Sequence, residues 1–164
     1  MVMHPHDAKK PRSSQDPLWN VFDIIQHYFY REDGSVNHDD QQATKLVINC
    51  MFDLLARLQP DELTAHEKVG IFAAQQYWLQ GANELAPLMI SISNAIESKI
   101  TYRRPAVDNR LSCVMQILSV DSDHFNDFPE FLENIRYAGL TDSEIVAVVG
   151  KHFSFIPQVK AFKV

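Results

Sequence analysis

Glycine and cysteine are both scarce in this chain, and their scarcity excludes several classes of functional site. Only five glycines occur in 164 residues. No glycine-rich phosphate-binding or dinucleotide-binding motif is present, nor is the G-x-S-x-G turn of a nucleophilic serine. The two cysteines, Cys50 and Cys113, form no C-x-x-C pair, which excludes a zinc ribbon and a thioredoxin-like redox site. Both lie in apolar helical patterns, so we expect buried thiols in a reducing compartment.

Residues typical of metal sites occur without the partners that a metal requires. The sequence HEKVG opens like a zinc-protease helix, but Gly70 stands where the second histidine is needed. Asp121 and Asp123 have the spacing that begins a calcium loop, whereas Leu132 stands where a bidentate glutamate is needed. The sequence predicts no metal, no cofactor and no catalytic residues, hence no enzyme. An active site assembled from sequence-distant residues stays an alternative.

Long apolar runs are also absent. No stretch of about 18 apolar residues is available to span a bilayer, and the first residues lack the apolar core of a secretory signal. The opening sequence MVMHPHDAKKPRSSQDP has three prolines and no periodic apolar face. We therefore predict a mobile arm over residues 1–16 and one folded domain over residues 17–164. With 46% hydrophobic and 22% charged residues, the chain has the composition of an ordinary globular protein, and we expect it in the cytoplasm.

What the chain does contain is a repeated helical pattern. Apolar residues recur at steps of three and four, most regularly between Ala43 and Leu58, as expected when one helical face is buried. The pattern predicts seven helices, over residues 17–31, 43–58, 64–80, 84–102, 105–118, 127–138 and 141–152. The last residues, QVKAFKV, are the only plausible strand. The expected fold is all-α, a single irregular bundle of about six or seven helices with an extended C-terminal tail.

Capping residues mark several of these helix ends. Asp16 followed by Pro17 is typical of an N-cap and a first helical position. Thr64 with Glu67, and Thr141 with Glu144, match the capping-box pattern. We also expect Asp127 and Pro129 to open the sixth helix. On the third helix, we expect Val69, Phe72 and Ala73 to face the core.

Negative charge is concentrated in the body of the chain. The net charge is −6, while residues 1–16 sum to +1 and residues 151–164 to +3, so residues 17–150 carry −10. An acidic body repels phosphate groups and attracts basic partners. This distribution favours a protein partner with a basic surface over nucleic acid.

Aromatic residues on two helices suggest where such a partner could bind. The first helix holds Trp19, Tyr28 and Tyr30, which point in several directions, and the third holds the adjacent Tyr77 and Trp78. Either these helices are buried nearly all round, or some of the rings lie at an interface, where Tyr and Trp are favoured. Together with the acidic loop residues, the candidate partner-binding residues are Trp19, Tyr28, Tyr30, Tyr77, Trp78, Asp121, Asp123 and Asp127.

The C-terminal sequence raises a second functional hypothesis. Val146, Gly150, Ile156 and Val159 occupy the spacing of a helix-turn-helix unit. Pro157 would then lie inside the recognition helix, where proline removes a backbone hydrogen bond. We therefore favour a capped helix followed by a packed tail that Phe155 and Phe162 anchor.

These observations define the expected function. We expect a small acidic protein that acts by protein–protein binding, such as an immunity or inhibitor protein that neutralises a toxin, or an adaptor or chaperone. A homodimer is compatible with the sequence. The alternative is a helical DNA-binding regulator that uses the C-terminal segment of residues 139–164.

Overall fold

The computed structural model describes residues 16–58 and 63–164 of the chain. Of the arm predicted over residues 1–16, all but Asp16 lies outside the described residues. Within them the fold is all-α, as predicted, and no strand is formed. The helices are α3 (Pro17–Phe29), α4 (Asp40–Ala56), α5 (Ala65–Gln80), the 3-10 helix η2 (Asn83–Leu85), α6 (Ala86–Glu97), α7 (Pro105–Leu118), α8 (His124–Ala138), α9 (Asp142–His152) and α10 (Pro157–Lys160).

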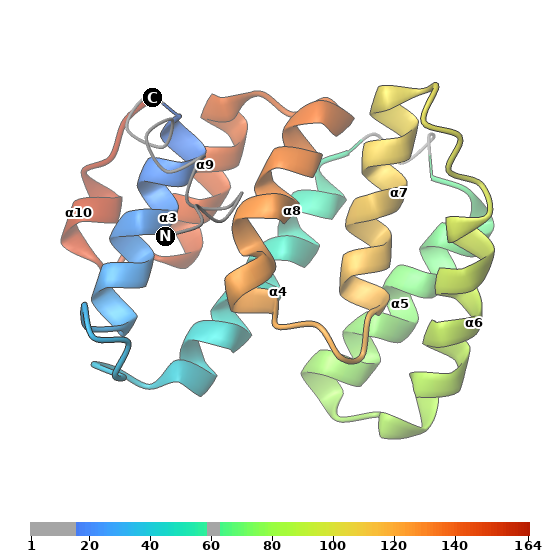
Figure 1. Cartoon of the computed structure of the whole chain (residues 1–164), viewed down its shortest axis with the longest axis horizontal. Coiled ribbons are helices and arrows are strands. Elements are labelled where there is room, and N and C mark those ends of the chain that lie inside the picture. Colours follow the sequence, from blue (N-terminus) through green and yellow to red (C-terminus); the bar gives the residue numbers. More distant parts are fainter. Residues whose placement is uncertain (1–15, 59–62) are drawn as a thin grey trace, which may run out of the picture.

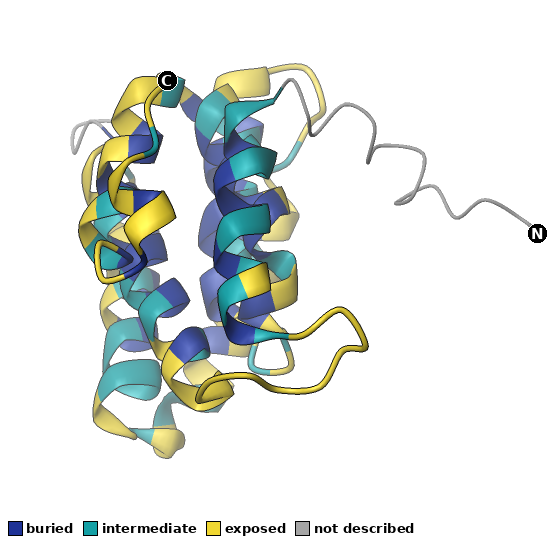
Figure 2. Ribbon diagram, turned by 90° about the vertical axis from the view of Figure 1, so that its left-hand side faces the viewer, coloured by how far each residue is buried: buried dark blue, intermediate teal, exposed yellow. Residues whose placement is uncertain are grey.

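The helices form two layers around one hydrophobic core. Figure 1 shows α3, α9 and α10 on the left, α4 and α8 in the middle, and α5, α6 and α7 on the right. In the side view, the buried residues of the two layers face each other and the exposed residues lie outside (Figure 2). Helix α8 is central because it packs against α3, α4, α7 and α9. Its phenylalanines Phe125, Phe128 and Phe131 are buried.

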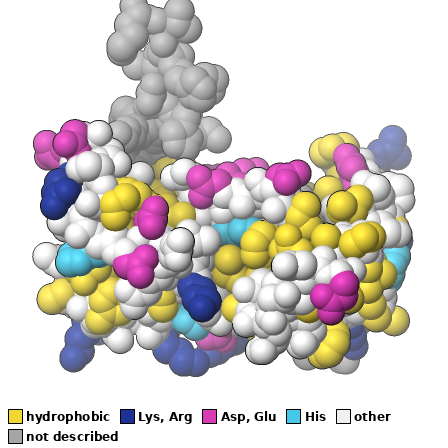
Figure 3. Space-filling view, turned by 90° about the horizontal axis from the view of Figure 1, so that it is seen from below, with side chains coloured by type: hydrophobic (Ala, Val, Ile, Leu, Met, Phe, Trp, Pro, Cys, Tyr) yellow, Lys and Arg dark blue, Asp and Glu magenta, His cyan; other side chains and the backbone are white. Residues whose placement is uncertain are grey.

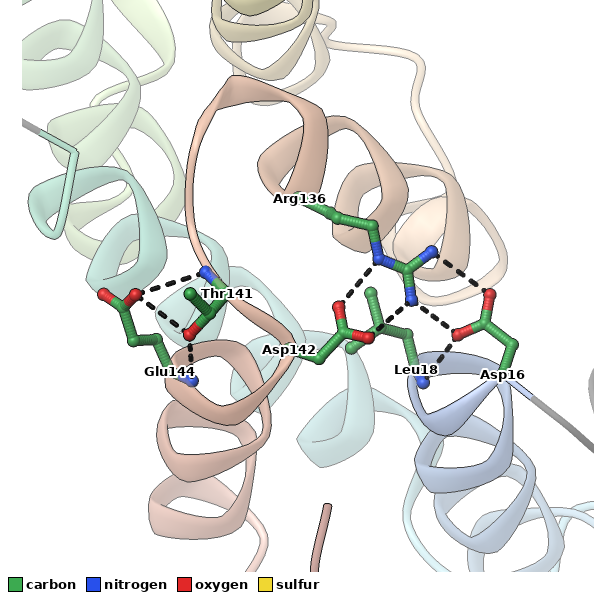
Figure 4. Close-up of polar contacts among 6 residues, drawn as sticks. All are labelled: Asp16, Leu18, Arg136, Thr141, Asp142 and Glu144. Carbon is green, nitrogen blue, oxygen red and sulfur yellow. Dashed lines mark hydrogen bonds and ion pairs between the residues drawn. The ribbon is translucent and has the colours of Figure 1, made fainter.

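The predicted N-caps of α3, α5 and α9 are present. The carboxylate of Asp16 accepts a hydrogen bond from the backbone N–H of Leu18 at 3.0 Å, and Pro17 is the first residue of α3. Thr64 and Glu67 form a capping box on α5. Thr141 and Glu144 form another on α9, which Figure 4 shows in close-up. These local hydrogen bonds explain why the helix starts could be predicted from sequence.

Arg136 joins the beginning of the fold to its end. Its guanidinium donates to Asp142 at the start of α9, with Nε 2.7 Å from Oδ1. The same group donates to Asp16 at the start of α3, with Nη2 2.7 Å from Oδ1 (Figure 4). The bonds raise the pKa of Arg136. Asp16 is thus part of the folded domain and not of an arm.

Helix α8 begins one turn earlier than predicted. Asp123, and not Asp127, is its N-cap, and Pro129 lies inside the helix. The earlier start brings Phe125 into the core, where its side chain is 2% exposed. The free energy gained by burying this ring and that of Phe128 outweighs the cost of the one backbone hydrogen bond that Pro129 cannot make.

Helix α5 presents a different face to the core from the one predicted. Val69 and Phe72 are 50% and 62% exposed, so the expectation that they face inward is wrong, whereas Ala73 is buried as predicted. The inward face consists of small residues because α6 approaches closely there. A Cβ atom added to Gly70 would lie only 3.0 Å from the side chain of Ile92.

The C-terminal segment folds back onto α3 and α9 and forms one further helical turn. Pro157 is the first residue of α10, a position where proline is favoured, so the plausible strand at residues 158–164 is not formed. Phe153, Ile156 and Val159 are buried and anchor this segment, whereas Phe155 is 46% exposed. The predicted role of Phe155 is therefore wrong. A recognition helix would be limited here to the four residues of α10.

Candidate partner-binding surface

The start of α4, the end of α5 and the start of α8 meet on one side of the molecule. This is the lower side in Figure 1, and Figure 3 views it from below. Acidic side chains gather along its upper edge in Figure 3, and hydrophobic side chains cover much of its right half, where α5 and α6 lie. Acidic and apolar groups thus share one face, although they come from distant parts of the sequence.

A hollow of about 570 Å³, which we call the α4–α5 hollow, opens on this side. It is lined by residues 39–42, Thr44, Lys45, Ile48 and Trp78. The indole N–H of Trp78 donates to the backbone carbonyl of Ile117 at 2.8 Å. The edge-to-face contact with the His124 ring, at 4.5 Å between centroids, also holds the indole in place. Trp78 therefore offers a fixed aromatic surface to the hollow.

Two carboxylates stand at the mouth of the hollow. Asp39 caps α4, because its Oδ1 accepts hydrogen bonds from the N–H groups of Gln41 and Gln42. Asp40 is exposed in the first turn and makes no such capping bond. Lys45 also lines the hollow and partly offsets the negative charge. Asp40 is thus the carboxylate most available to an incoming cation.

The negative charge of this surface affects the pKa of Tyr30. Burial raises the pKa of Tyr30, and the carboxylates of Asp40 and Asp123 raise it further. The ring packs on Phe125, 5.2 Å between centroids. The start of α4 and the start of α8 therefore both place a negative charge near one tyrosine.

The structure brings some of the predicted site residues together and separates the others. Trp78, Tyr77, Tyr30 and Asp123 lie on this side, and the exposed Asp121 precedes Asp123 in the same loop. The rings of Tyr77 and Trp78 contact each other at 4.7 Å.

The remaining three predicted residues lie elsewhere. Tyr28 lines a hollow between α3 and α10, where it stacks on His38 at 4.3 Å. Trp19, in the first turn of α3, packs against Phe22 at 6.4 Å. Asp127 lines a groove along α7 and accepts a hydrogen bond from the hydroxyl of Ser122 at 2.9 Å. These residues do not belong to one surface with Trp78.

The groove that Asp127 lines, which we call the α7 groove, runs between the end of α6 and the outer side of α8. It has a volume of about 430 Å³. Glu97 and Tyr102 line one end, Met115 of α7 also lines the groove, and Asp127 and Glu130 line the α8 side. The α7 groove thus carries acidic groups of its own, separate from the α4–α5 hollow.

Sequence reasoning missed three residues that shape these surfaces. Asp40 lines the same hollow as Trp78, although nothing in the local sequence places the two together. His124 is 1% exposed and its ring contacts that of Trp78, and its Nε2 has no hydrogen-bond partner among the described residues. Tyr102 is 92% exposed and has a positive φ of 60°. None of these placements has a signal in the linear sequence.

Neither a metal-binding cluster among the described residues nor a similar protein indicates a function for the chain. No group of three or more His, Cys, Asp or Glu side chains suited to a metal ion occurs in residues 16–58 and 63–164. In the same residues, no helix has the length and apolar character to cross a bilayer. Comparison with protein-family models, curated proteins and solved structures finds no match to the chain.

Proposed function

We propose that the protein acts by binding a basic protein partner through the side that carries the α4–α5 hollow. The observation that supports this proposal best is the meeting of Asp39, Asp40 and the fixed ring of Trp78 around one hollow. Aromatic residues with a polar handle dominate the binding energy of many protein interfaces. A carboxylate beside such a ring attracts a cationic side chain.

An arginine of the partner suits this hollow chemically. Its planar guanidinium can stack on the Trp78 ring while its N–H groups donate to the carboxylate of Asp40. A lysine ammonium can contact the same groups, but it lacks the planar stacking surface. Asp121 and Asp123, at the edge of the same side, would steer a basic surface toward the hollow.

The class of protein that we propose is a stoichiometric binder in the cytoplasm, such as an inhibitor or immunity protein, or an adaptor or chaperone. Both cysteines are free and buried, and burial raises the pKa of each thiol well above its ordinary value. Unreactive free thiols are compatible with a reducing compartment. The alternative DNA-binding function would depend on the short α10, and the lysines there have no long recognition helix to accompany them.

Affinity capture with a charge-reversal variant tests the proposal. The full chain, carrying an affinity tag, is used to capture partners from cells of the source organism, and these are identified by mass spectrometry. Asp40→Lys places a positive charge at the mouth of the hollow, whereas Asp23→Lys makes the same change at the hollow that Tyr28 lines. Trp78→Phe keeps a ring but removes the indole.

We expect a basic protein that the wild type and Asp23→Lys capture equally and that Asp40→Lys loses. Titration of that purified protein should show weaker binding by Trp78→Phe and weaker binding at high salt, because exposed charges are screened. Equal capture by Asp40→Lys and the wild type would contradict the proposal. Recovery of nucleic acid, retained by Asp40→Lys, would support the alternative function instead.

A further inference from the structure

The loop between α6 and α7 holds a tyrosine in an unusual state. Tyr102 has φ of 60°, a left-handed conformation that tyrosine rarely adopts, and its side chain is 92% exposed. The ring therefore contributes almost no burial to the folded chain. A conformation that costs free energy and displays an aromatic ring is a feature that requires an explanation.

Hydrogen bonds from the loop to one carboxylate fix this conformation. Asp108, in the first turn of α7, accepts from the N–H of Thr101 and from the N–H of Arg104, each at 3.2 Å. The guanidinium of Arg104 in turn donates to the carbonyl of Lys99 at 3.1 Å. The loop is thus tied at both sides of Tyr102, and the exposed ring is presented from a fixed backbone.

Tyr102 stands at the border of two depressions on the outer face of α7. It lines the α7 groove on one side and a smaller hollow of about 280 Å³, beside Pro105 and Asn109, on the other. Met115 and Ile100 line the groove and supply apolar contact area. A projecting ring beside a partly apolar hollow gives this face both a knob and a hole.

The loop beside one end of the α7 groove and the α8 side at the other end carry opposite net charges. Lys99, Arg103 and Arg104 are exposed in the loop around Tyr102 but do not line the groove, whereas Glu97 does. Together with the carboxylate of Asp108, which the loop binds, these charges sum to +1 (three positive, two negative). At the other end lie Asp127 and Glu130, and the chain has no lysine or arginine between Arg110 and Arg136. A uniformly basic partner would be repelled at the loop end. A surface with the same two charged ends, laid antiparallel, would be attracted at both.

We propose that the α7 face binds a second copy of this chain in a two-fold dimer. A two-fold axis near Met115 would set the two α7 helices antiparallel, with the Tyr102 loop of each copy over Asp127 and Glu130 of the other. Such an interface uses the same patch on both subunits and requires that the patch be complementary to itself. The bipolar charge and the knob-and-hole shape meet this requirement. The proposal does not rest on partner binding at the α4–α5 hollow, which involves other residues.

Sedimentation velocity of the full chain at increasing concentration measures this association. We expect the wild type to shift from the mass of one chain toward twice that mass. Glu130→Lys and Arg103→Glu each create like charges at both equivalent contacts of the dimer, so each variant alone should self-associate at least about tenfold more weakly. Circular dichroism of each variant checks that the helices are retained.

Mixing the two variants gives the decisive result. The acidic loop of Arg103→Glu then faces the basic end of Glu130→Lys, and the two unchanged ends also match, so we expect a heterodimer to form. Tyr102→Gly should weaken association without lowering the unfolding temperature of the dilute chain, because glycine adopts positive φ without strain. The control Tyr137→Ala removes a tyrosine that is also exposed, at 58%, but does not line the groove.

Three outcomes would overturn the dimer. They are a wild type that stays at the mass of one chain at every concentration, charge reversals that leave self-association unchanged, and a mixture that does not recover association. A dimer that is sensitive to Tyr137→Ala and insensitive to Tyr102→Gly would also overturn it, since it would use another face. None of these results would bear on capture through Asp40.

Discussion

The buried ion pair between Glu67 and Arg110 gives the most quantitative test of this fold. Arg110 Nε lies 2.9 Å from Glu67 Oε1, and the two side chains are only 8% and 2% exposed. The pair joins the first turn of α5 to the middle of α7. Arg110→Met keeps most of the side-chain volume but leaves the carboxylate of Glu67 buried without a cation. We expect a loss of about 3–5 kcal/mol in the free energy of unfolding.

The contribution of Glu67 to the free energy of unfolding should change with pH in opposite directions in this variant and in the wild type. Burial raises the pKa of Glu67, but hydrogen bonds from Arg110 and Thr64 outweigh it, so the pKa lies below its ordinary value of 4.5. In the wild type, the pair therefore adds stability above that value, and this contribution is lost as the pH falls through the folded-state pKa. In Arg110→Met the burial effect prevails and raises the pKa. Lowering the pH toward about 4.5 should then reduce the loss in free energy of unfolding that Arg110→Met causes.

Urea unfolding followed by circular dichroism at several pH values measures both effects. The double variant Glu67→Gln with Arg110→Met removes both charges, and its amide oxygen can still accept from the N–H of Thr64. We expect it to be more stable at neutral pH than Arg110→Met alone, since no uncompensated charge remains buried. A loss below about 1 kcal/mol for Arg110→Met, or an unchanged pH dependence, would refute this reasoning.

Three further predictions concern the C-terminal segment, the polar link and the buried histidine. Phe153→Ala should cost about 3–5 kcal/mol in chemical denaturation and Phe155→Ala clearly less, because only the first ring is fully buried. Arg136→Met should cost about 1.5–3 kcal/mol, measured by the same method, because two carboxylates lose charged hydrogen bonds. Burial lowers the pKa of His124, so its contribution to stability is complete above about pH 6.5 and declines as the pH falls toward the folded-state value. Replacing His124 with Leu should remove that part of the pH dependence between about pH 7.5 and 5.5, as urea titrations at both values would show.

The sequence was sufficient to predict the helices, since the information for each is local. All seven predicted segments correspond to helices from α3 to α9. Capping residues such as Thr64 and Thr141 bond to N–H groups within three positions of themselves. The errors at the start of α8 and at α10 both concern proline. Pro129, predicted to open the sixth helix, lies inside α8, and Pro157, predicted to lie in an extended tail, is the first residue of α10.

The orientation of α5 could not be predicted, because its apolar residues are not confined to one face. Val69, Phe72 and Ala73 fit one stripe, while Gly70, Ala73 and Ala74 fit another. The choice between them depends on how closely α6 approaches, and only tertiary packing determines that distance. Small residues face the core because Ile92 and Leu118 already fill the space near Gly70.

The candidate surfaces were predictable in composition but not in arrangement. The sequence predicted an acidic body and interfacial aromatic residues, and Trp78 does lie beside Asp39 and Asp40. That neighbourhood depends on the packing of α4 near the end of α5, across almost 40 residues of sequence. Tyr28 and Trp19 are also aromatic residues of the helices but lie at other parts of the surface. Residue type alone therefore does not distinguish interface aromatics from the others.

Tyr102 shows why an unfavourable local conformation is informative where a favourable one is not. A left-handed conformation costs a non-glycine residue about 1–2 kcal/mol. The bonds to Asp108 stabilise the loop backbone, and they would do so equally with glycine at position 102. The exposed ring makes no compensating contribution to the stability of the isolated chain. If the ring is retained for association, Tyr102→Gly should weaken self-association without lowering folding stability, whereas a purely structural role for the tyrosine predicts a lower folding stability.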